Sequence, residues 1–583
     1  MLPTALVDGG GKRWVEVGPR RPELESKAGE LSRRLDLHPL AARVLVARGF
    51  SEPSSAARFL DPPLEDLPDP FSMLGMGEAV ERLERALLAG ERIACYGDYD
   101  VDGVTSTALL SGFLKSAGGD VVAYVPHRLA EGYGLNAGAV ATLAAGGVKL
   151  LVSLDCGITD VDEVREAAAR GVDTVVVDHH TVPVELPAAT AILNPHQPGC
   201  PYPSKDLAAV GVTFALVMAL RRRLRQGGRF GAARPEPNLL EALDLVALGT
   251  IADVASLTGA NRILVHFGLG VLSRGRRPGV RALKRVSGMA EGSPVTAGQV
   301  GFRLAPRINA AGRLDDAGRG VRLLTERDDE AARSLAEELD RENHARQEIE
   351  RHILSEAEAE AEPRVAAGAR GLVLAREGWH PGVVGIVASR LVERFHRPVL
   401  LVGFENGVGR GSGRSIESFH LHEALSACAS HLLRFGGHEH AAGLTIERGR
   451  LEAFRAAFEG YAASRLSAED LEPRCRIDAW VEDADLTDRA AKDLARLSPF
   501  GAGHPEPVFA LRGVSARSGT VGQRKAHLRL AIGARRLDAI GFGMGDRAEL
   551  CGGPIDAAFT LGFDEWDGER RLRLKLRDLR RAG

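Results

Sequence analysis

The sequence has 583 residues, of which 44% are hydrophobic and 26% are charged, and its formal net charge is −3. A chain of this length and composition excludes a single small core and an intrinsically disordered protein, so we expect several globular domains. A net charge near zero neither indicates nor excludes nucleic-acid binding, because such binding needs only a local basic surface.

The cysteines and the apolar segments limit the type of protein further. The six cysteines stand far apart and form no Cys-x-x-Cys pair, unlike a structural zinc site or a small secreted disulfide framework. The start, MLPTALVDGGGKRW, has no apolar stretch of signal-peptide length, and no later apolar run approaches the roughly 20 residues of a membrane helix. We therefore expect a cytoplasmic protein that does not contact a membrane.

The first half of the chain changes character near residue 75. Residues 1–75 predict a small helical domain that packs on the segment after it, because LAARVLVARGF has helical apolar spacing. Residues 76–325 alternate short β-branched runs such as LLVSL with helical segments such as VDEVREAAAR. This alternation predicts an α/β domain with a mostly parallel sheet and helices on both faces. Its basic stretch 221–238 is expected to be an exposed loop.

The second half predicts three further parts. Residues 326–364 are charged, alanine-rich and apolar at helical spacing, which indicates one long connecting helix. Residues 365–465 return to alternation, from the strand GLVLA to a helix over HLHEALSACASHLL, so we expect a second, smaller α/β domain. Residues 466–583 contain short alternating stretches such as HLRLAIG and RLRLKLRDL, which indicate a small β-barrel.

Acidic residues and histidines stand where three strands of the first α/β domain end. The strands IACY, LLVSL and TVVV run into these residues: Asp98, Asp100, Asp102, Asp155, Asp178, His179 and His180. The carboxyl ends of parallel strands open on one edge of a doubly wound sheet, where such folds bind ligands. We therefore expect five carboxylates and two imidazoles to converge at that edge.

Such a cluster predicts a metal site. Carboxylates in a partly dry site repel one another unless cations lie between them. A mixed carboxylate and imidazole shell favours Mn²⁺, and Mg²⁺ is the alternative where oxygen ligands dominate. Two ions about 4 Å apart can activate water and stabilise the leaving oxygen of a phosphodiester. The register at 98–103 also fits the start of an EF-hand calcium loop, but no glutamate stands at its last position and the segment follows a strand.

These motifs resemble those of the DHH phosphoesterase superfamily, named for the triplet seen here at residues 178–180, and in particular its RecJ-type exonucleases. The resemblance runs from about residue 38 to residue 510 and includes RIACYGDYDVDGVTSTALL, LLVSLDCGIT, FRLAPRINAAGR, GRGSGRS and FGGHEHAAGLTI in the family's order. It implies a DHH domain, a smaller DHHA1 domain and a terminal oligonucleotide-binding (OB) barrel. The implied activity is two-metal hydrolysis of single-stranded DNA from the 5′ end, with release of 5′-phosphorylated nucleotides, in DNA repair and recombination.

The resemblance also assigns roles to residues. The implied metal ligands are Asp98, Asp100, Asp102, Asp155, His179 and Asp253. Asp155 is the implied bridge between two Mn²⁺ ions, and Asp155 and His180 are the implied catalytic groups. Asp253 rests on the resemblance alone, because it lies in a helical stretch. The implied substrate contacts are Arg128, Ser412 and Arg414 at the 5′-phosphate, His438 at a phosphate, and Arg307, Asn309 and Arg313 along the strand.

Further contacts and partners complete these expectations. Gly103 opens a helix whose N-terminus can seat a phosphate. In the last domain, Arg524, Lys525 and Arg529 are candidates for a basic groove along the strand. The expected partners are single-stranded DNA, a single-strand-binding protein and a RecQ-type helicase, and the chain is expected to act as a monomer.

Two other functions stay open at this point. A DHH hydrolase of cyclic dinucleotides or very short oligonucleotides would use the same metal site, but such relatives typically lack the helical preface and the terminal barrel. A binding protein could keep the fold without the chemistry, although every expected metal ligand is present here. Comparing long single strands with dinucleotides tests the first alternative, and metal-dependent nucleotide release tests the second.

Overall fold

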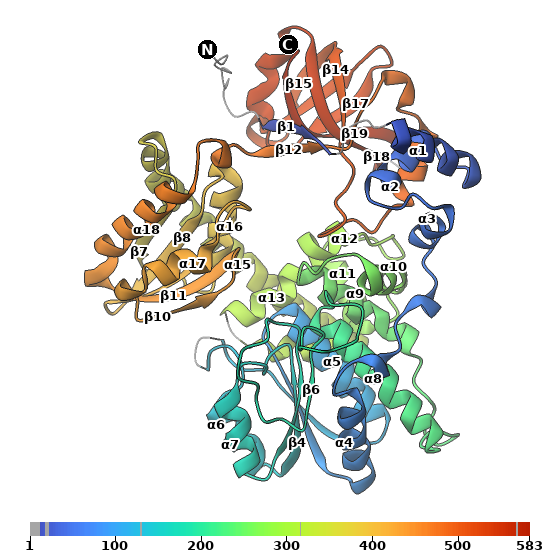
Figure 1. The fold of residues 1–583 in the computed structure, drawn as a ribbon, viewed down its shortest axis with the longest axis vertical. Coiled ribbons are helices and arrows are strands. Elements are labelled where there is room, and N and C mark those ends of the chain that lie inside the picture. Colours follow the sequence, from blue (N-terminus) through green and yellow to red (C-terminus); the bar gives the residue numbers. More distant parts are fainter. Residues whose placement is uncertain (1–11, 18–21, 129–130, 315, 567–568, 583) are drawn as a thin grey trace. The chain divides into compact units, whose positions relative to one another are not determined.

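The computed structural model describes residues 12–17, 22–128, 131–314, 316–566 and 569–582 (Figure 1). Contacts divide the chain into a first unit, residues 63–352 with 499–504, and a second unit, residues 1–62, 353–498 and 505–583. Within the described ranges, no helix combines the length and the apolar composition that a bilayer crossing requires. The first eleven residues, where we expect no signal peptide, lie outside the described part.

A five-stranded parallel sheet forms the centre of the first unit. Its spatial order is β3 (Asp120–Tyr124), β2 (Arg92–Gly97), β4 (Val148–Leu154), β5 (Asp173–Val177) and β6 (Ala191–Leu193). One face packs against α4 (Met76–Ala89), α5 (Val101–Ser116) and α8 (Ala209–Gln226), and the other against α6 (Ala137–Ala145) and α7 (Val161–Ala169). The prediction of a parallel sheet covered on both faces is confirmed.

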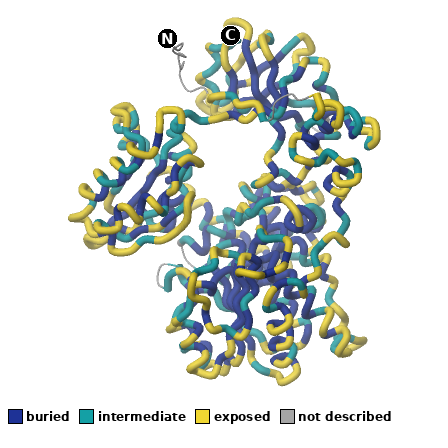
Figure 2. The backbone as a smooth tube through the Cα atoms, in the orientation of Figure 1, coloured by how far each residue is buried: buried dark blue, intermediate teal, exposed yellow. Residues whose placement is uncertain are grey.

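Strand β2 shows why this sheet needs helices on both faces. Ile93 and Cys95 belong to the core beneath α4, α5 and α8, whereas Ala94 and Tyr96 pack with α6 and α7. All four side chains are fully buried. In Figure 2 the backbone at the centre of the first unit is mainly dark blue, the colour of buried residues. Successive strand residues point to opposite faces, so an unbroken apolar run suits a strand that is covered twice.

The remainder of the first unit is helical. Its helices are α9 (Leu243–Ala252), α10 (Gly259–Arg274), α11 (Pro278–Val286), α12 (Ala297–Gln299), α13 (Ala305–Leu314) and α14 (Gly318–Thr325). The predicted connecting helix is present as α15 (Asp329–Ala366), which begins in the first unit and ends in the second. The prediction that 221–238 is a loop was wrong in part, because residues 221–226 complete α8 and Arg225 there binds Glu236 at 3.0 Å.

The second unit contains the predicted smaller α/β domain. Its mixed sheet has the order β10 (Arg434–Gly437), β11 (Ala441–Glu447), β9 (Val408–Arg414), β8 (Val399–Glu405) and β7 (Leu372–Glu377). Its helices are α16 (Val384–Phe395), α17 (Leu421–Ala427) and α18 (Leu451–Arg465). The helix expected over HLHEALSACASHLL ends at Ala427, and the GGHEHAAG stretch after it turns from the edge strand β10 into its neighbour β11.

The last domain is built on a seven-stranded sheet. The order is β13 (Ala479–Trp480), β14 (Phe509–Val514), β18 (Ile555–Trp566), β19 (Glu569–Arg581), β17 (Leu537–Gly541), β16 (His527–Ile532) and β15 (Ala516–Val521). A short helix, α19 (Asp488–Ala495), precedes β14. Alternating side chains of β16 are buried, which agrees with the period-two pattern of HLRLAI.

The N-terminal segment packs on this last domain, which corrects the expectation that it packs on the segment after it. It consists of β1 (Arg13–Glu16), α1 (Pro22–Arg34), α2 (Pro39–Ala47) and α3 (Pro53–Leu60). Strand β1 pairs in parallel with β12 (Arg474–Ile477). The backbone N–H of His38 donates to Asp493 at 2.7 Å, and Asp36 pairs with Arg489 at 2.5 Å. The partner of this segment therefore comes from the far end of the chain.

Close packing of α10 on α9 predicts opposite effects for two glycines of one helix. A Cβ on Gly268 would lie 2.3 Å from the carbonyl oxygen of Leu243 and 2.6 Å from the Cβ of Ala247. The Gly268→Ala change should therefore destabilise the first unit by about 1 to 3 kcal/mol. In the control Gly270→Ala, the nearest atom is the flexible end of Arg274 at 3.7 Å, and the better helix former should stabilise by up to about 1 kcal/mol. Thermal unfolding of the full chain checks this, and equal melting temperatures would contradict the packing.

Candidate metal centre

The first acidic loop is held by its own middle residue. Asp98 directly follows β2, and Asp100 is the N-cap of α5, where its Oδ1 accepts from the amides of Asp102 at 2.8 Å and Gly103 at 3.1 Å. Because these amides are already bonded, the phosphate seat expected at this helix N-terminus lacks two of its donors. Glycine is required at position 103 for steric reasons, since a Cβ there would lie 2.4 Å from the carbonyl oxygen of Asp98.

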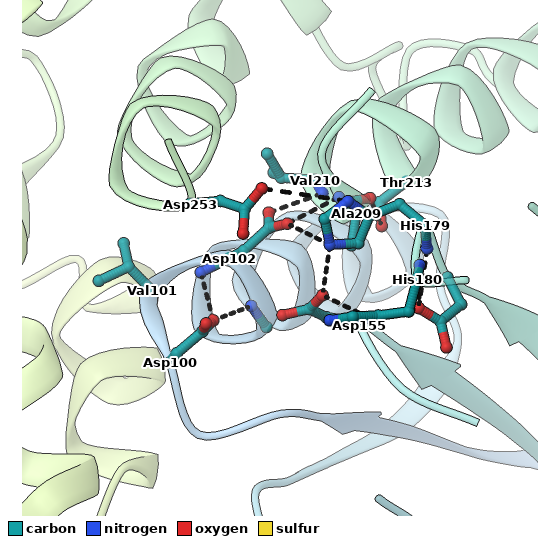
Figure 3. A network of polar contacts seen from close by, with 12 residues as sticks. Asp100, Val101, Asp102, Asp155, His179, His180, Ala209, Val210, Thr213 and Asp253 are labelled. Atoms are coloured by element: carbon teal, nitrogen blue, oxygen red, sulfur yellow. Dashed lines mark hydrogen bonds and ion pairs between the residues drawn. The ribbon is translucent and has the colours of Figure 1, made fainter. Parts of the chain in front are cut away.

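Asp102 is buried in the first turn of α5 and points at the start of another helix. Its two oxygens accept from the amides of Ala209 at 2.7 Å and Val210 at 2.9 Å, the first residues of α8 (Figure 3). The positive end of a helix stabilises a carboxylate in this position. The carboxylate is thereby fixed beside His179, whose Nε2 lies 3.9 Å from Asp102 Oδ2.

Asp155 occupies the centre of the cluster. It follows β4 with φ of 67°, a left-handed conformation in which aspartate is enriched, and its amide donates to the carbonyl of Val177 on β5. Its Oδ1 lies 3.2 Å from His179 Nε2 and 3.8 Å from His180 Nδ1. The strand ends therefore meet as expected, and the structure brings Asp155 and both histidines together (Figure 3).

Asp178 differs from the other strand-end acids. Its Oδ1 accepts from the amides of His179 and His180 at 2.7 and 3.1 Å and lies 2.8 Å from His180 Nδ1. Its Oδ2 accepts from the amide of Ile158 at 3.0 Å. Asp178 thus fixes the loop and orients His180. The fifth carboxylate of the ligand groups is Asp253 instead. Asp253 ends α9, and its Oδ2 lies 4.0 Å from His179 Nδ1.

The ligand atoms fall into overlapping groups that fit divalent cations. Three sets bring one ligand atom of each member within 4.8 Å of the others: Asp98 with Asp100 and Asp155, Asp102 with His179 and Asp253, and Asp155 with His179 and His180. Asp98 Oδ1, Asp155 Oδ1 and His179 Nε2 are buried and have no hydrogen-bond partner. Buried polar atoms of this kind are costly unless a partner such as a cation satisfies them. This donor set, in which oxygen predominates and nitrogen takes part, suits Mn²⁺ or Mg²⁺.

Electrostatics point the same way. Burial, reinforced by the charge of Asp100 in each case, raises the pKa values of Asp155 and Asp98 well above normal and that of Asp102 to about 7. Burial and the charge of Asp102 raise the pKa of Asp253 to about 9. These carboxylates resist joint ionisation in the protein alone. Cations bound between them would remove that penalty.

The two histidines have opposite tendencies, as expected from their different environments. Burial, followed by the charge of His180, lowers the pKa of His179 to about 4, so its ring is neutral and able to ligate a metal. Burial is the largest single influence on His180 and would lower its pKa, but the hydrogen bond and charge of Asp178, together with the charges of Asp253 and Asp100, outweigh burial and raise that pKa to about 9. His180 is therefore an imidazolium beside the cluster.

Tyr133 is a residue of this site that sequence reasoning missed. Its hydroxyl lies 3.3 Å from both the carbonyl oxygen of Asp155 and Nδ1 of His180. The loop that carries Tyr133 is anchored two residues further on, where the amide of Leu135 donates to Asp160 at 2.6 Å. The sequence feature that could have indicated Tyr133 is its position between two glycines in EGYGLN, since the chain has six tyrosines.

The substrate contacts predicted for the first unit lie after β3 and on α13. The guanidinium of Arg128 stacks over the ring of Tyr99, 4.8 Å from its centroid. On α13, Asn309 Oδ1 accepts from the amide of Val101 at 3.1 Å, and Arg307 binds Asp340 at 2.8 Å. Arg313 is on the same helix.

The remaining predicted contacts belong to the second unit. Ser412 and Arg414 share one face of β9, and Arg414 Nη1 donates to Ser412 Oγ at 3.2 Å. A Cβ on Gly385, in the first turn of α16, would lie 2.8 Å from Ser412 Oγ and 3.4 Å from Arg414 Nη2. A hydroxyl, a guanidinium and a helix N-terminus thus meet in a corner suited to an anion. His438 follows β10, and its Nδ1 accepts from the amide of His440 at 3.3 Å.

The candidate OB-groove residues lie on strand β16 and in the turn before it. Arg524 and Lys525 both have positive φ in the turn before β16, and Arg529 on β16 pairs with Asp538 at 2.7 Å.

Comparison with known proteins finds similarity in both units of the chain. Three family models match: "DHH family, N-terminal domain" at 92–250, "DHHA1 domain" at 368–464 and "RecJ OB domain" at 477–578. The chain is 40% identical to the single-stranded-DNA-specific exonuclease RecJ of Dickeya dadantii, over 96% of this chain and 98% of that protein. It is 38% identical to the protein of the same name from Bacillus subtilis, over 97% of this chain and 70% of that protein.

Solved structures agree with this similarity. RecJ of Thermus thermophilus in complex with Mn²⁺ is 34% identical, with a TM-score of 0.83 over 98% of this chain and 79% of that one. A second structure of that protein is a complex with Mg²⁺, with a TM-score of 0.77 and 33% identity over 98% of this chain and 78% of that one. The overall similarity includes both the sheet that positions the acids and the domains of the second unit.

Replacing the central carboxylate, Asp155, should weaken cation binding and so reduce the stabilisation that cations give the folded chain. Asparagine also tolerates the left-handed conformation, so Asp155→Asn keeps the backbone while it removes one charge from the buried cluster. With chelator present, the variant should melt at the same or a higher temperature than the unchanged chain. Mn²⁺ at about 100 times its Kd should stabilise the unchanged chain by about 2.7 kcal/mol per site, and the variant by much less. Asp162→Asn, at an exposed position of α7, is the matched control, and equal stabilisation of all three proteins would refute the metal site.

Proposed function

The chain belongs to the RecJ family of single-stranded-DNA-specific exonucleases, and from this premise we propose that it hydrolyses single-stranded DNA from the 5′ end. The products are 5′-phosphorylated nucleotides, and the activity serves DNA repair and recombination. The observation that carries the proposal is the convergence of Asp98, Asp102, Asp155, His179 and Asp253. Three ligand atoms of this cluster, Asp98 Oδ1, Asp155 Oδ1 and His179 Nε2, are buried without a hydrogen-bond partner.

The carboxylates and His179 would hold two cations, Mn²⁺ or Mg²⁺. Asp155 groups with Asp98 and Asp100 and also with His179, which in turn groups with Asp102 and Asp253. Asp155 is therefore suited to be the shared ligand. When bound, such ions supply an activated water molecule and stabilise the leaving oxygen of the phosphodiester. The amides of Ala209 and Val210 and the cap at Asp100 keep the ligands in place before a substrate arrives.

His180 contributes charge rather than ligation in this proposal. Asp178 orients its ring and keeps it protonated, and the hydroxyl of Tyr133 lies against the same Nδ1 side. A positioned imidazolium can neutralise a phosphate oxygen or give a proton to the departing oxygen. Removing Asp178 would therefore affect the reaction through His180.

The end of the strand is held by a phosphate anchor in the second unit. Ser412 and Arg414 meet beside the N-terminus of α16, where an arginine can grip two phosphate oxygens. Arg128, over the ring of Tyr99, is a further phosphate contact. His438, Arg307, Asn309 and Arg313 are proposed as contacts to the strand.

Digestion of end-labelled single strands tests the function directly. With Mn²⁺ or Mg²⁺, label at the 5′ end should appear at once in short products, label at the 3′ end should appear last, and chelator should stop both. Activity confined to dinucleotides would favour the small-substrate alternative, and strand binding without any release would favour a protein that lacks the chemistry. Full-length similarity to named exonucleases favours neither alternative.

Several expectations stay predictions. They concern association with a single-strand-binding protein and with a RecQ-type helicase, action as a monomer, the cytoplasmic location, the bounds of the five predicted segments, and a basic groove at Arg524, Lys525 and Arg529.

The anchor makes a specific prediction about strand ends. Arg414→Ala should lower kcat/KM on 5′-phosphorylated strands by about 10- to 100-fold, because a charge-assisted contact of about 1.5 to 3 kcal/mol is lost. Strands with a 5′-hydroxyl should lose little. Arg450→Ala, an exposed arginine of the same unit paired with Glu447, is the control. Equal losses on both kinds of end would remove the anchoring role.

A further inference from the structure

An exposed phenylalanine, Phe302, lies on the surface near Asp253 and has no role in the metal centre described above. Phe302 is 83% exposed, the largest exposed fraction among the large aromatic side chains of the described residues. Within the described part of the chain, its ring has no aromatic or cationic partner. A phenylalanine left in water forgoes the stabilisation that burial of its ring would give. The exposed ring is therefore available to pack against a bound ligand.

The local backbone turns this ring outward. Phe302 is in a π-helical turn, η4 (Val300–Leu304), inserted between α12 and α13. Val300 and Leu304 are fully buried and anchor the turn, so the residue midway between them faces away from the core. Insertions of this kind interrupt an α-helix at some cost and occur frequently at functional sites.

The turn lies against the helix that supplies a metal ligand. A Cβ on Gly301 would be 4.0 Å from Cγ2 of Ile251, two residues before Asp253. Directly after Asp253, Val254 is 70% exposed and has φ of 61°, a rare conformation for a β-branched residue. The loop is pinned in this state, since the amide of Leu257 donates to the carbonyl of Ala502 at 2.8 Å. A second apolar side chain is thus held out to solvent next to the ligand.

Cationic groups accompany the ring. Arg303, the next residue, is exposed, and within the described ranges its guanidinium binds no other side chain. One turn further, Arg307 and Asn309 continue along α13 toward the acidic loop, where Asn309 binds the amide of Val101. An exposed ring beside an uncommitted arginine is the combination that holds single-stranded nucleic acid, with the base stacked and the phosphate neutralised.

We propose that Phe302 is a stacking platform for one base of the single-stranded substrate beside the metal centre, with Arg303 at the adjoining phosphate. The proposal deepens the proposed function and rests on it. Because every base has a π-face, this platform grips the strand without reading its sequence. It holds the nucleotide near the metal ligand Asp253, so that the strand stays registered between successive cuts.

Kinetics on 5′-phosphorylated oligodeoxynucleotides tests the platform. Phe302→Ala should raise KM by roughly tenfold with kcat little changed, as expected for one lost stacking contact. Phe302→Trp should keep KM near the unchanged value, whereas Phe302→Leu should be as poor as alanine, because leucine is apolar but does not stack. Phe71→Ala, an exposed ring covered by Arg222 at 5.4 Å, is the matched control and should have no effect. Recovery by leucine, or an unchanged KM in the alanine variant, would overturn the proposal.

Substrates with a single abasic position identify the stacked base. Moving this position along the strand should raise KM of the unchanged chain at one site, and Phe302→Ala should add nothing further at that site. Equal additional losses at every position would refute a defined platform. Fluorescence anisotropy of labelled strands in chelator separates this inference from the proposed function. If the chain binds strands through Phe302 but cuts none, the stacking platform stands and the proposed nuclease activity is refuted. If the chain neither binds strands through Phe302 nor cuts them, both proposals are refuted.

Discussion

Mutual repulsion of buried carboxylates is the interaction on which the first unit depends. Asp98 and Asp102 follow one strand and Asp155 its neighbour, and the charges of the first two add to the cost of ionising the third. A protein that placed these acids only for stability would separate them. Here the fold holds them together with capping bonds, helix amides and a left-handed backbone at Asp155. The arrangement has a physical purpose only with cations between the carboxylates.

The sequence predicted this centre well where the ligands follow strands. Asp98 and Asp155 could be placed because apolar runs reveal buried strands, and the ends of parallel strands share an edge. Asp253 could not be placed in this way, since it ends a helix whose packing beside His179 depends on the whole unit. Adjacent sequence also could not show that Asp178 turns back onto its own loop, nor that Tyr133 reaches His180 from a loop of another strand.

Fold class followed from local patterns, but the partners of whole segments did not. The alternation of β-branched and helical runs predicted both α/β domains, and the charged alanine-rich stretch predicted α15. The N-terminal helices have equally clear apolar faces, yet such a face does not say which surface covers it. Their position was decided by β1 pairing with β12 and by the contact of His38 with Asp493, which join residues from opposite ends of the chain.

Glycines around the acidic loop explain why the carboxylates cannot relax apart. A Cβ on Gly312 would lie 2.4 Å from the carbonyl oxygen of Tyr99, and one on Gly249 would lie 3.0 Å from Asp102 Oδ1 and 2.3 Å from Thr105 Oγ1. The helices α13 and α9 therefore approach the loop more closely than any side chain would permit. A loop enclosed in this way cannot swing outward to dilute its charge. The repulsion is retained in the folded protein, and bound cations are what can relieve it.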